Sequence, residues 1–284
     1  FRRVLFRSDD SEYQLDAAEA TKKAENVVAA LRRSPVHPSL ALCRLAQPPL
    51  TSAEQRKTGA YYTDFRLARF LARRVSSVSE HPTVIDTASG TGVLLAAFAL
   101  EAYGADPVSM GHFLAEGVYA ADLSTSALRG ARLALCSLAS EVESLQPLRS
   151  HLLCRDSLAT TQEEWAQLTP GRFHLVIGNP PWEKLKLTKH EVSLELGHKR
   201  HYGAEHEGHQ EAQVGHALKS GRAQLGEYVA QLATRYPLAA DGEFDLYKAF
   251  VELAISLVRD DGCIALRDGR LNANPCHQRA RPFP

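Results

Sequence analysis

Short apolar runs alternate along the chain with longer segments in which apolar residues recur at helical spacing. The runs are TVID (83–86), GVYAAD (117–122), HLLCRD (151–156) and FHLVIG (173–178). Apolar runs of this length, bounded by turn residues, predict buried strands of a parallel sheet. Strands that alternate with helices predict an α/β fold with a mostly parallel sheet and helices on both faces.

The helical spacing recurs between and around these runs. We expect helices within 11–45, from Asp64 to Val75, over 93–102, over 124–140 and over 245–258, followed by a last strand from Cys263. Thr63 or Asp64 can cap the second of these helices. A polar, histidine-rich stretch, 183–240, predicts a solvated, partly helical flap, whereas Trp165 with its acidic neighbours predicts a surface connector.

The first apolar run leads into a glycine-containing turn, DTASGTG (86–92), and then into a helix. Gly90 and Gly92 allow a ligand to approach the backbone closely, and amide N–H groups at the start of the helix can bind it. Leu95 stands where the third glycine of a G-x-G-x-x-G motif would be, which disfavours a dinucleotide. Asp86 beside the turn suits a ligand with a cationic end better than a pyrophosphate.

Two further apolar runs end in an acidic residue, Asp122 and Asp156. Because the carboxyl ends of parallel strands meet at one edge of a sheet, we expect both to lie near Asp86, where α/β folds bind ligands. A single acidic residue there is commonly a helix cap. Three carboxylates beside a glycine turn, however, predict a pocket for a nucleoside with a positive centre, and S-adenosylmethionine has that chemistry.

The most specific motif is Asn179-Pro180-Pro181-Trp182, directly after the fourth run. The prolines have no N–H group, so the Pro180 carbonyl and the Asn179 amide oxygen can both accept hydrogen bonds from one exocyclic amino group. Such a nitrogen is a poor nucleophile because its lone pair is delocalised into the ring. Two acceptors stabilise the positive charge that develops on it during attack. Trp182 can stack on the base, a contact worth about 1–3 kcal/mol.

With these motifs the chain resembles the adenine-specific DNA methyltransferases of restriction–modification and anti-phage systems, in particular type IIG-like methylases. RKTGAYYTD (56–64) is similar to the family's Tyr-Tyr-Thr-Pro segment, DTASGTG to its Asp-Pro-Ala-Cys-Gly-Ser-Gly turn, and NPPW to its catalytic motif. The segments after NPPW and over 235–252 also look like family segments, so the resemblance covers about residues 50–266. It implies a Rossmann-like class I fold that uses S-adenosylmethionine.

The resemblance also implies a role for each residue of these motifs. The implied cofactor-binding residues are Tyr61, Tyr62, Thr63, Asp86, Ala88, Gly90, Gly92, Asp122 and Asp156, and the implied catalytic residues are Asn179, Pro180, Pro181 and Trp182. The Tyr61–Thr63 segment would close over the methionine end of the cofactor, with its ribose on Asp122 and its adenine on Asp156. The implied reaction transfers a methyl group to N6 of an adenine flipped out of double-stranded DNA.

Other functions fit the same motifs. An RNA base or a protein glutamine amide presents the same weakly nucleophilic nitrogen, so NPPW alone does not separate these substrates from DNA. The Tyr-Tyr-Thr segment and the long insert favour DNA. Alternatively, the chain is a non-catalytic cofactor- or DNA-binding subunit of a defence complex. A restriction nuclease or a specificity module in a longer protein is a further expected partner.

The amino-acid composition excludes several classes of protein. With 44% hydrophobic and 23% charged residues the chain has the balance of a globular protein, and no apolar run approaches the roughly 20 residues that span a bilayer. We therefore expect a cytoplasmic protein without a membrane partner. The five cysteines form no C-x-x-C pair, and His206-Glu207-Gly208-His209 lacks H-E-x-x-H spacing, so no metal site is expected.

The two ends of the chain differ from the rest. Residues 1–8, FRRVLFRS, match one reading frame of a sequencing-library adapter, and without their three arginines the balance of 33 basic and 33 acidic residues becomes 30 and 33. Residues 267–284 lack periodicity where the family continues with an apolar strand that ends in Val-Pro. We expect a helical segment over 9–50, a catalytic domain over 51–266 with an insert over 183–240, and a missing target-recognition domain.

Overall fold

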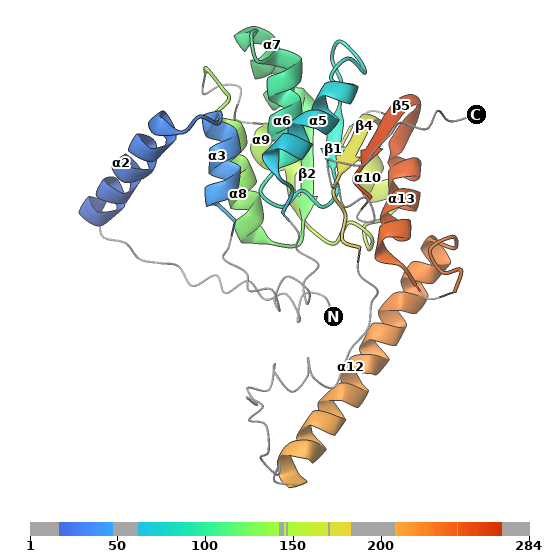
Figure 1. Ribbon diagram of the computed structural model, residues 1–284. Coiled ribbons are helices and arrows are strands. Elements are labelled where there is room, and N and C mark those ends of the chain that lie inside the picture. The colour runs from blue at the N-terminus through green and yellow to red at the C-terminus, as the bar shows by residue number, and fades with distance from the viewer. Residues whose placement is uncertain are drawn as a thin grey trace, which may run out of the picture.

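The core of the protein is a parallel β-sheet with helices on both faces (Figure 1). The computed structural model describes residues 17–47, 62–141, 145, 147–169, 171–182, 208–242 and 244–268. Its strands are β1 (Val84–Asp86), β2 (Val118–Asp122), β3 (Leu152–Cys154), β4 (Phe173–Gly178) and β5 (Val258–Leu266). They pair in the order β3-β2-β1-β4-β5, all parallel, which confirms the predicted α/β class.

The strand order reverses at β1, which lies between β2 and β4. Val84 of β1 pairs with Val118 on one side and with Leu175 on the other. The chain leaves β1 toward β2 and β3, and later returns to the other side of β1 to form β4. In open α/β sheets such a reversal leaves a crevice at the carboxyl ends of the two central strands, where ligands bind.

The fifth strand departs from the sequence-based prediction. It was expected to start at Cys263, but β5 begins at Val258, directly after the preceding helix. Its register against β4 is irregular, because Phe173 pairs with Val258 whereas Leu175 pairs with Cys263. The polar residues between these positions have no strand-like alternation, and only pairing with the start of β4 brings them into the sheet.

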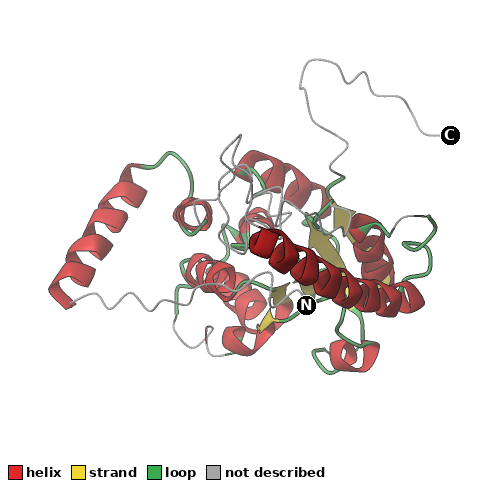
Figure 2. Ribbon diagram, turned by 90° about the horizontal axis from the view of Figure 1, so that it is seen from below, coloured by secondary structure: helices red, strands yellow, loops and turns green. Residues whose placement is uncertain are grey.

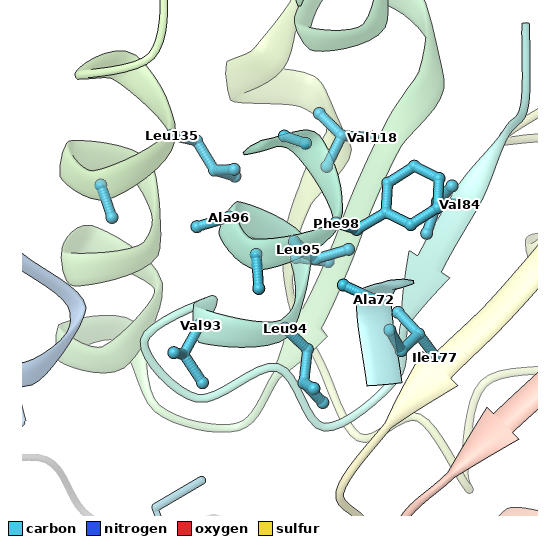
Figure 3. Close-up of a cluster of buried hydrophobic side chains, with 14 of the residues drawn as sticks. Ala72, Val84, Val93, Leu94, Leu95, Ala96, Phe98, Val118, Leu135 and Ile177 are labelled. Atoms are coloured by element: carbon cyan, nitrogen blue, oxygen red, sulfur yellow. The ribbon is translucent and has the colours of Figure 1, made fainter. Parts of the chain in front are cut away.

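Four helices pack together on one face of the sheet. They are α3 (Pro38–Leu45), α5 (Phe65–Val75), α6 (Val93–Tyr103) and α8 (Thr125–Cys136). Three of them pack on the strands, and α3 packs on α6 and α8. The central one, α6, is apolar on almost every side because it packs on the sheet and against α5 and α8. In Figure 3 its side chains Leu95 and Phe98 lie among Val84 of β1, Val118 of β2 and Leu135 of α8.

The opposite face carries a second buried cluster. Ile85 and Val176 of the sheet belong to it together with Phe250 of α13 (Leu246–Leu257), and it includes Trp165 of the short helix α10 (Gln162–Ala166). The prediction that Trp165 belongs to a surface connector is wrong, because its side chain is only 2% exposed. A helix of five residues is too short to show a periodic apolar face in the sequence, so the tertiary contact was not visible there.

A long helix, α12 (Gly208–Arg235), lies within the predicted flap. In Figure 1 it projects away from the sheet, and Figure 2 views the molecule from the side toward which it projects. Its C-terminal end is held in the second cluster by Leu232, which is 2% exposed. The expectation of a partly helical flap is thus confirmed for the described part of the insert, and His190, His198, His201 and His206 lie outside the described residues.

Several helix ends also differ from the expected bounds. The N-terminal helical segment is divided into α2 (Ala17–Arg33) and α3, because Pro38 begins the second helix, where its missing N–H group costs nothing. Helix α8 ends at Cys136, four residues before the expected end. Asp64 and Asp245 cap α5 and α13 as N-cap residues. Besides α10, three short elements were not expected, α7 (Pro107–His112), a π-helical turn (Phe113–Gly117) and α9 (Leu148–His151).

None of the helices in the described ranges combines the length and the apolar character that a membrane crossing requires.

Candidate active site

The glycine turn joins β1 to α6 at the carboxyl edge of the sheet. Gly90 has φ +52° and Gly92 has φ +77°, both in the left-handed region that favours glycine. The turn is held against β2, because the Ser89 N–H donates to the Ala121 carbonyl at 3.0 Å. A Cβ on Gly92 would lie 2.9 Å from Cβ of Ala131, whereas a Cβ on Gly90 would meet no atom within 4 Å. Gly92 therefore permits close packing of α8, and Gly90 leaves open space beside the turn.

Asp122, the last residue of β2, fixes this turn. Its Oδ2 accepts a hydrogen bond from the Gly90 N–H at 2.8 Å, and its Oδ1 accepts one from the Ser124 N–H at 2.8 Å. Ser124, not Asp122, is the N-cap of α8. Asp122 thus lies directly against the glycine turn, as expected for carboxyl ends of neighbouring strands.

Asp86, at the end of β1, is almost completely buried. Its side chain is 1% exposed, and its Oδ1 accepts a hydrogen bond from the Ala88 N–H at 3.0 Å. Burial, with a smaller contribution from the nearby charge of Asp122, raises the pKa of Asp86 to about 7. A cation placed beside this carboxyl group would favour its ionised form.

Asp156 also lies at this edge, but not at the end of a strand. The third strand ends at Cys154, so the predicted strand was two residues too long. The loop still follows β2, because the Arg155 N–H donates to the Asp122 carbonyl at 3.1 Å. Asp156 Oδ1 accepts from the Leu158 N–H at 3.0 Å, and Oδ2 accepts from the Tyr228 hydroxyl at 2.7 Å. Nothing in the sequence marked Tyr228, which lies on α12 in the polar insert.

Asn179 follows β4 directly and meets a residue from the N-terminal half of the chain. Its Nδ2 donates a hydrogen bond at 3.0 Å to Oγ1 of Thr63, which is 8% exposed and lies just before α5. A Cβ on Gly178 would lie 3.4 Å from Oδ1 of Asp86, so the ends of β4 and β1 are in close contact here. The structure therefore brings the start of the NPPW motif, Thr63 and Asp86 together.

Trp182 is half-buried, and a cation lies over its ring. The Arg267 guanidinium carbon is 4.7 Å from the centroid of the Trp182 ring, and the Arg267 N–H donates to the Gly178 carbonyl at 3.0 Å. Partial burial lowers the pKa of Arg267 from its ordinary value. Arg267 directly follows β5, in the stretch where the sequence showed no periodicity, so its place beside the motif was not expected.

One pocket brings together six of the twelve expected site residues that the structure describes. Its lining comes from the segment before α5, the β1 turn, the start of α6 and the end of β4, and it includes Tyr62, Thr63, Asp86, Ala88, Ser89, Gly90 and Asn179. Asp122 contacts it through Gly90. Burial raises the pKa of Tyr62 to about 12, and the charge of Asp122 contributes. Tyr61 lies outside the described residues.

The residues of this pocket fit a nucleoside with a cationic centre. The Ser89 hydroxyl is buried in the pocket and has no hydrogen-bond partner among the described residues, so a polar ligand group could satisfy it. Asp86 supplies a buried carboxyl group that a cation would stabilise, and the open side of Gly90 leaves room for a close approach. The cationic centre of S-adenosylmethionine is chemically compatible with the Asp86 carboxyl group, and its polar groups with the Ser89 hydroxyl. In the described ranges no cluster of three or more His, Cys, Asp or Glu side chains could hold a metal ion.

The sequence model of the Eco57I restriction-modification methylase family matches residues 116–266, more than half of the chain. The chain belongs to this family. The match includes β2 to β5, with Asp122, Asp156 and the NPPW motif, whereas the glycine turn lies before it. No curated protein sequence matches this Eco57I-family chain.

Two solved structures are similar to this Eco57I-family member. A cryo-EM structure of a DrdV–DNA complex matches with a TM-score of 0.55 and 15% identity, over 88% of this chain and 25% of that chain. An ATP-dependent Type ISP restriction-modification enzyme, LlaBIII, bound to DNA matches with a TM-score of 0.45 and 12% identity, over 93% of this chain and 20% of that chain. The DrdV match supports the fold, and the chain spans about a quarter of the length of that protein.

Proposed function

We propose that this chain transfers the methyl group of S-adenosylmethionine to the exocyclic N6 amino group of adenine in DNA, within a restriction–modification or phage-defence system. The observation that carries this proposal is that Asn179, the first residue of NPPW, lines the same pocket as Asp86 and Gly90. An acceptor group for a target amino nitrogen thus lies beside a pocket suited to a cationic nucleoside. Membership of a restriction–modification methylase family supports the same reaction.

The cofactor would lie across the carboxyl edge of the sheet. In this arrangement Asp86 and the Tyr61–Thr63 segment hold the methionine end, Asp122 accepts hydrogen bonds from the ribose hydroxyls and Asp156 accepts one from the adenine amino group. The bound cofactor supplies an electrophilic methyl group on a positively charged sulfur. Burial of Asp86 strengthens its attraction for a cation because the surroundings screen charge less than water does.

Asn179 and Pro180 would orient the target nitrogen. The Asn179 Oδ1 and the Pro180 carbonyl accept its two hydrogens, which favours a pyramidal nitrogen and stabilises the positive charge that forms there. Thr63 contributes by holding the Nδ2 end of the same amide, which turns the Oδ1 end toward the target. Catalysis then consists of positioning and charge stabilisation, without a covalent enzyme intermediate.

The target adenine must leave the duplex, because its amino group is otherwise buried in a base pair. Trp182 would stack on the extruded ring, a contact worth about 1–3 kcal/mol. In this role Trp182 fixes the plane of the base, and Asn179 and Pro180 fix the direction of its amino group.

The test is to incubate the protein with methyl-tritiated S-adenosylmethionine in three parallel reactions. One reaction contains double-stranded DNA, one contains RNA and one contains a protein mixture. We expect label in DNA, and nucleoside analysis should identify it as N6-methyladenine. Label only in RNA or in glutamine side chains would overturn the DNA assignment. Cofactor binding without transfer to any substrate would instead indicate the non-catalytic subunit. The Asn179→Ala variant is the control for transfer by a contaminating enzyme.

A further inference from the structure

The C-terminal part of α12 and the residue after it are attached to the loop after β3 by three side chains. Arg235 donates to the carbonyls of Leu158 and Thr160 at 2.9 and 3.0 Å, and Tyr236, just beyond the helix, donates to the Leu158 carbonyl at 3.1 Å. These bonds end on main-chain atoms. The third side chain, Tyr228, lies two helical turns earlier and ends on a carboxylate, Oδ2 of Asp156, at 2.7 Å.

We infer that Tyr228 is a positioning residue of the cofactor's adenine subsite, where its hydroxyl orients the Asp156 carboxylate toward the adenine amino group. This inference rests on the proposed function, in which Asp156 accepts that hydrogen bond. It adds to the site a residue of the insert, a part of the chain to which the NPPW and glycine-turn motifs assign no role.

The contacts of Asp156 explain why such a residue is needed. Asp156 lies in a loop two residues beyond β3, so no strand fixes the direction of its side chain. The Leu158 N–H holds Oδ1 from within the loop, and the Tyr228 hydroxyl holds Oδ2 from another element. Together the two donors fix the plane of the carboxylate. Each carboxylate oxygen can accept two hydrogen bonds, so both donors are compatible with a further bond to an amino group.

The position of the Tyr228 ring agrees with this role. The ring is half-buried and packs against the same buried cluster as Ala88, which belongs to the glycine turn and lines the candidate cofactor pocket. Tyr228 therefore connects the insert helix to this buried cluster through its ring and to the loop that carries Asp156 through its hydroxyl. A residue that served only to attach α12 could end on a main-chain carbonyl, as Arg235 and Tyr236 do, whereas Tyr228 ends on a carboxylate.

The experiment compares Tyr228→Phe with the matched control Tyr236→Phe. Each variant loses one phenol hydroxyl that bonds to the 156–160 loop, but only the first loses a bond to Asp156. Calorimetry would measure binding of S-adenosylhomocysteine and of S-inosylhomocysteine, in which a carbonyl oxygen replaces the adenine amino group. Thermal unfolding of each variant would be recorded alongside.

We expect the wild type to prefer the amino ligand. Tyr228→Phe should weaken the binding of S-adenosylhomocysteine about 3- to 10-fold and leave the binding of S-inosylhomocysteine unchanged. The preference for the ligand with the amino group should therefore become smaller. Tyr236→Phe should lower stability and leave the preference intact. Three results for Tyr228→Phe would overturn the inference while the proposed function stands. They are an equal loss of affinity for both ligands, an unchanged ratio of the two affinities, or tighter binding of S-adenosylhomocysteine. A wild type that binds neither ligand would overturn the proposed function as well.

Discussion

Asn179 donates a hydrogen bond at 3.0 Å to Thr63, a residue 116 positions earlier in the chain. The bond joins the start of the NPPW motif to the segment that precedes α5. Thr63 was expected from the sequence to bind the cofactor, and its contact with Asn179 gives it a second task at the same place. The hydrogen bond thus joins the two halves of the candidate site. Asn179, which would bind the target amino group, also binds Thr63 in the segment beside the cofactor.

Thr63→Val should therefore reduce methyl transfer through Asn179. Valine has the shape of threonine but cannot accept the hydrogen bond, so the amide loses its fixed orientation. We expect kcat to fall about 10- to 100-fold, the affinity for cofactor to fall much less, and Thr63→Ser to stay close to wild type. Steady-state kinetics with calorimetric cofactor binding would check this. A parallel loss of cofactor binding would show that Thr63 acts on the cofactor alone.

Asn179→Ala tests the acceptor itself. Alanine removes both the Oδ1 acceptor and the bond to Thr63, so kcat should fall about 100- to 1,000-fold while cofactor binding survives. The measurement is tritium transfer to DNA together with equilibrium binding of S-adenosylhomocysteine. Loss of transfer and of binding to the same extent would contradict the assignment of Asn179 to the target side of the site.

The raised pKa of Asp86 predicts a specific pH dependence of stability. The folded protein keeps this proton up to about pH 7, whereas an unfolded chain releases it near pH 3.8. Between these values the folded state binds more protons, so this residue lowers the free energy of unfolding as pH rises. Asp86→Asn removes the effect. Relative to wild type, the variant should gain about 2–4 kcal/mol of stability between pH 4 and pH 8.

Urea unfolding at several pH values would measure the effect of Asp86→Asn, and Asp106→Asn is its control. The pKa of Asp106 is lowered by hydrogen bonds from Ser109, so its contribution has the opposite sign and is lost as pH falls. The Asp86→Asn variant should also lose cofactor affinity despite its greater stability at pH 8. A stability gain that does not depend on pH would mean that Asp86 is ionised in the free protein.

Gly92→Ala should destabilise the protein more than Gly171→Ala. Both glycines have positive φ, +77° and +91°, so an added Cβ is strained at either position. At Gly92 the Cβ would also lie 2.9 Å from Ala131, whereas Gly171 has open space around it. Because of this overpacking, the free energy of unfolding of Gly92→Ala, measured in urea, should be about 1–3 kcal/mol lower than that of Gly171→Ala. Equal losses would indicate that α8 moves away freely.

Much of the fold could be predicted because the informative features are local. In the structure β1 and β2 end at Asp86 and Asp122, and Asn179 directly follows the end of β4 at Gly178. Parallel pairing alone places these residues at one edge of the sheet. The positive φ values of Gly90 and Gly92 agree with a close turn after β1. Local apolar patterns therefore sufficed to locate the candidate site.

The features that escaped prediction depend on contacts between distant parts of the chain. Trp165 is buried in a cluster that also contains residues of α12 and α13, and Tyr228 reaches Asp156 across 72 positions. Arg267 lies over Trp182 only because β5 pairs with β4. Residue type and spacing do not predict these long-range contacts, because the contacts form only when the helices and strands pack together in the folded protein.

The burial of Asp86 affects both the enthalpy of binding of a cationic ligand and the number of protons released when that ligand binds. With a pKa of about 7, the carboxyl group carries its proton in a large fraction of molecules near neutral pH. A cationic ligand that requires the ionised form must expel that proton into the medium. Association would therefore release a fraction of a proton per site, and its apparent enthalpy would change with the ionisation heat of the buffer.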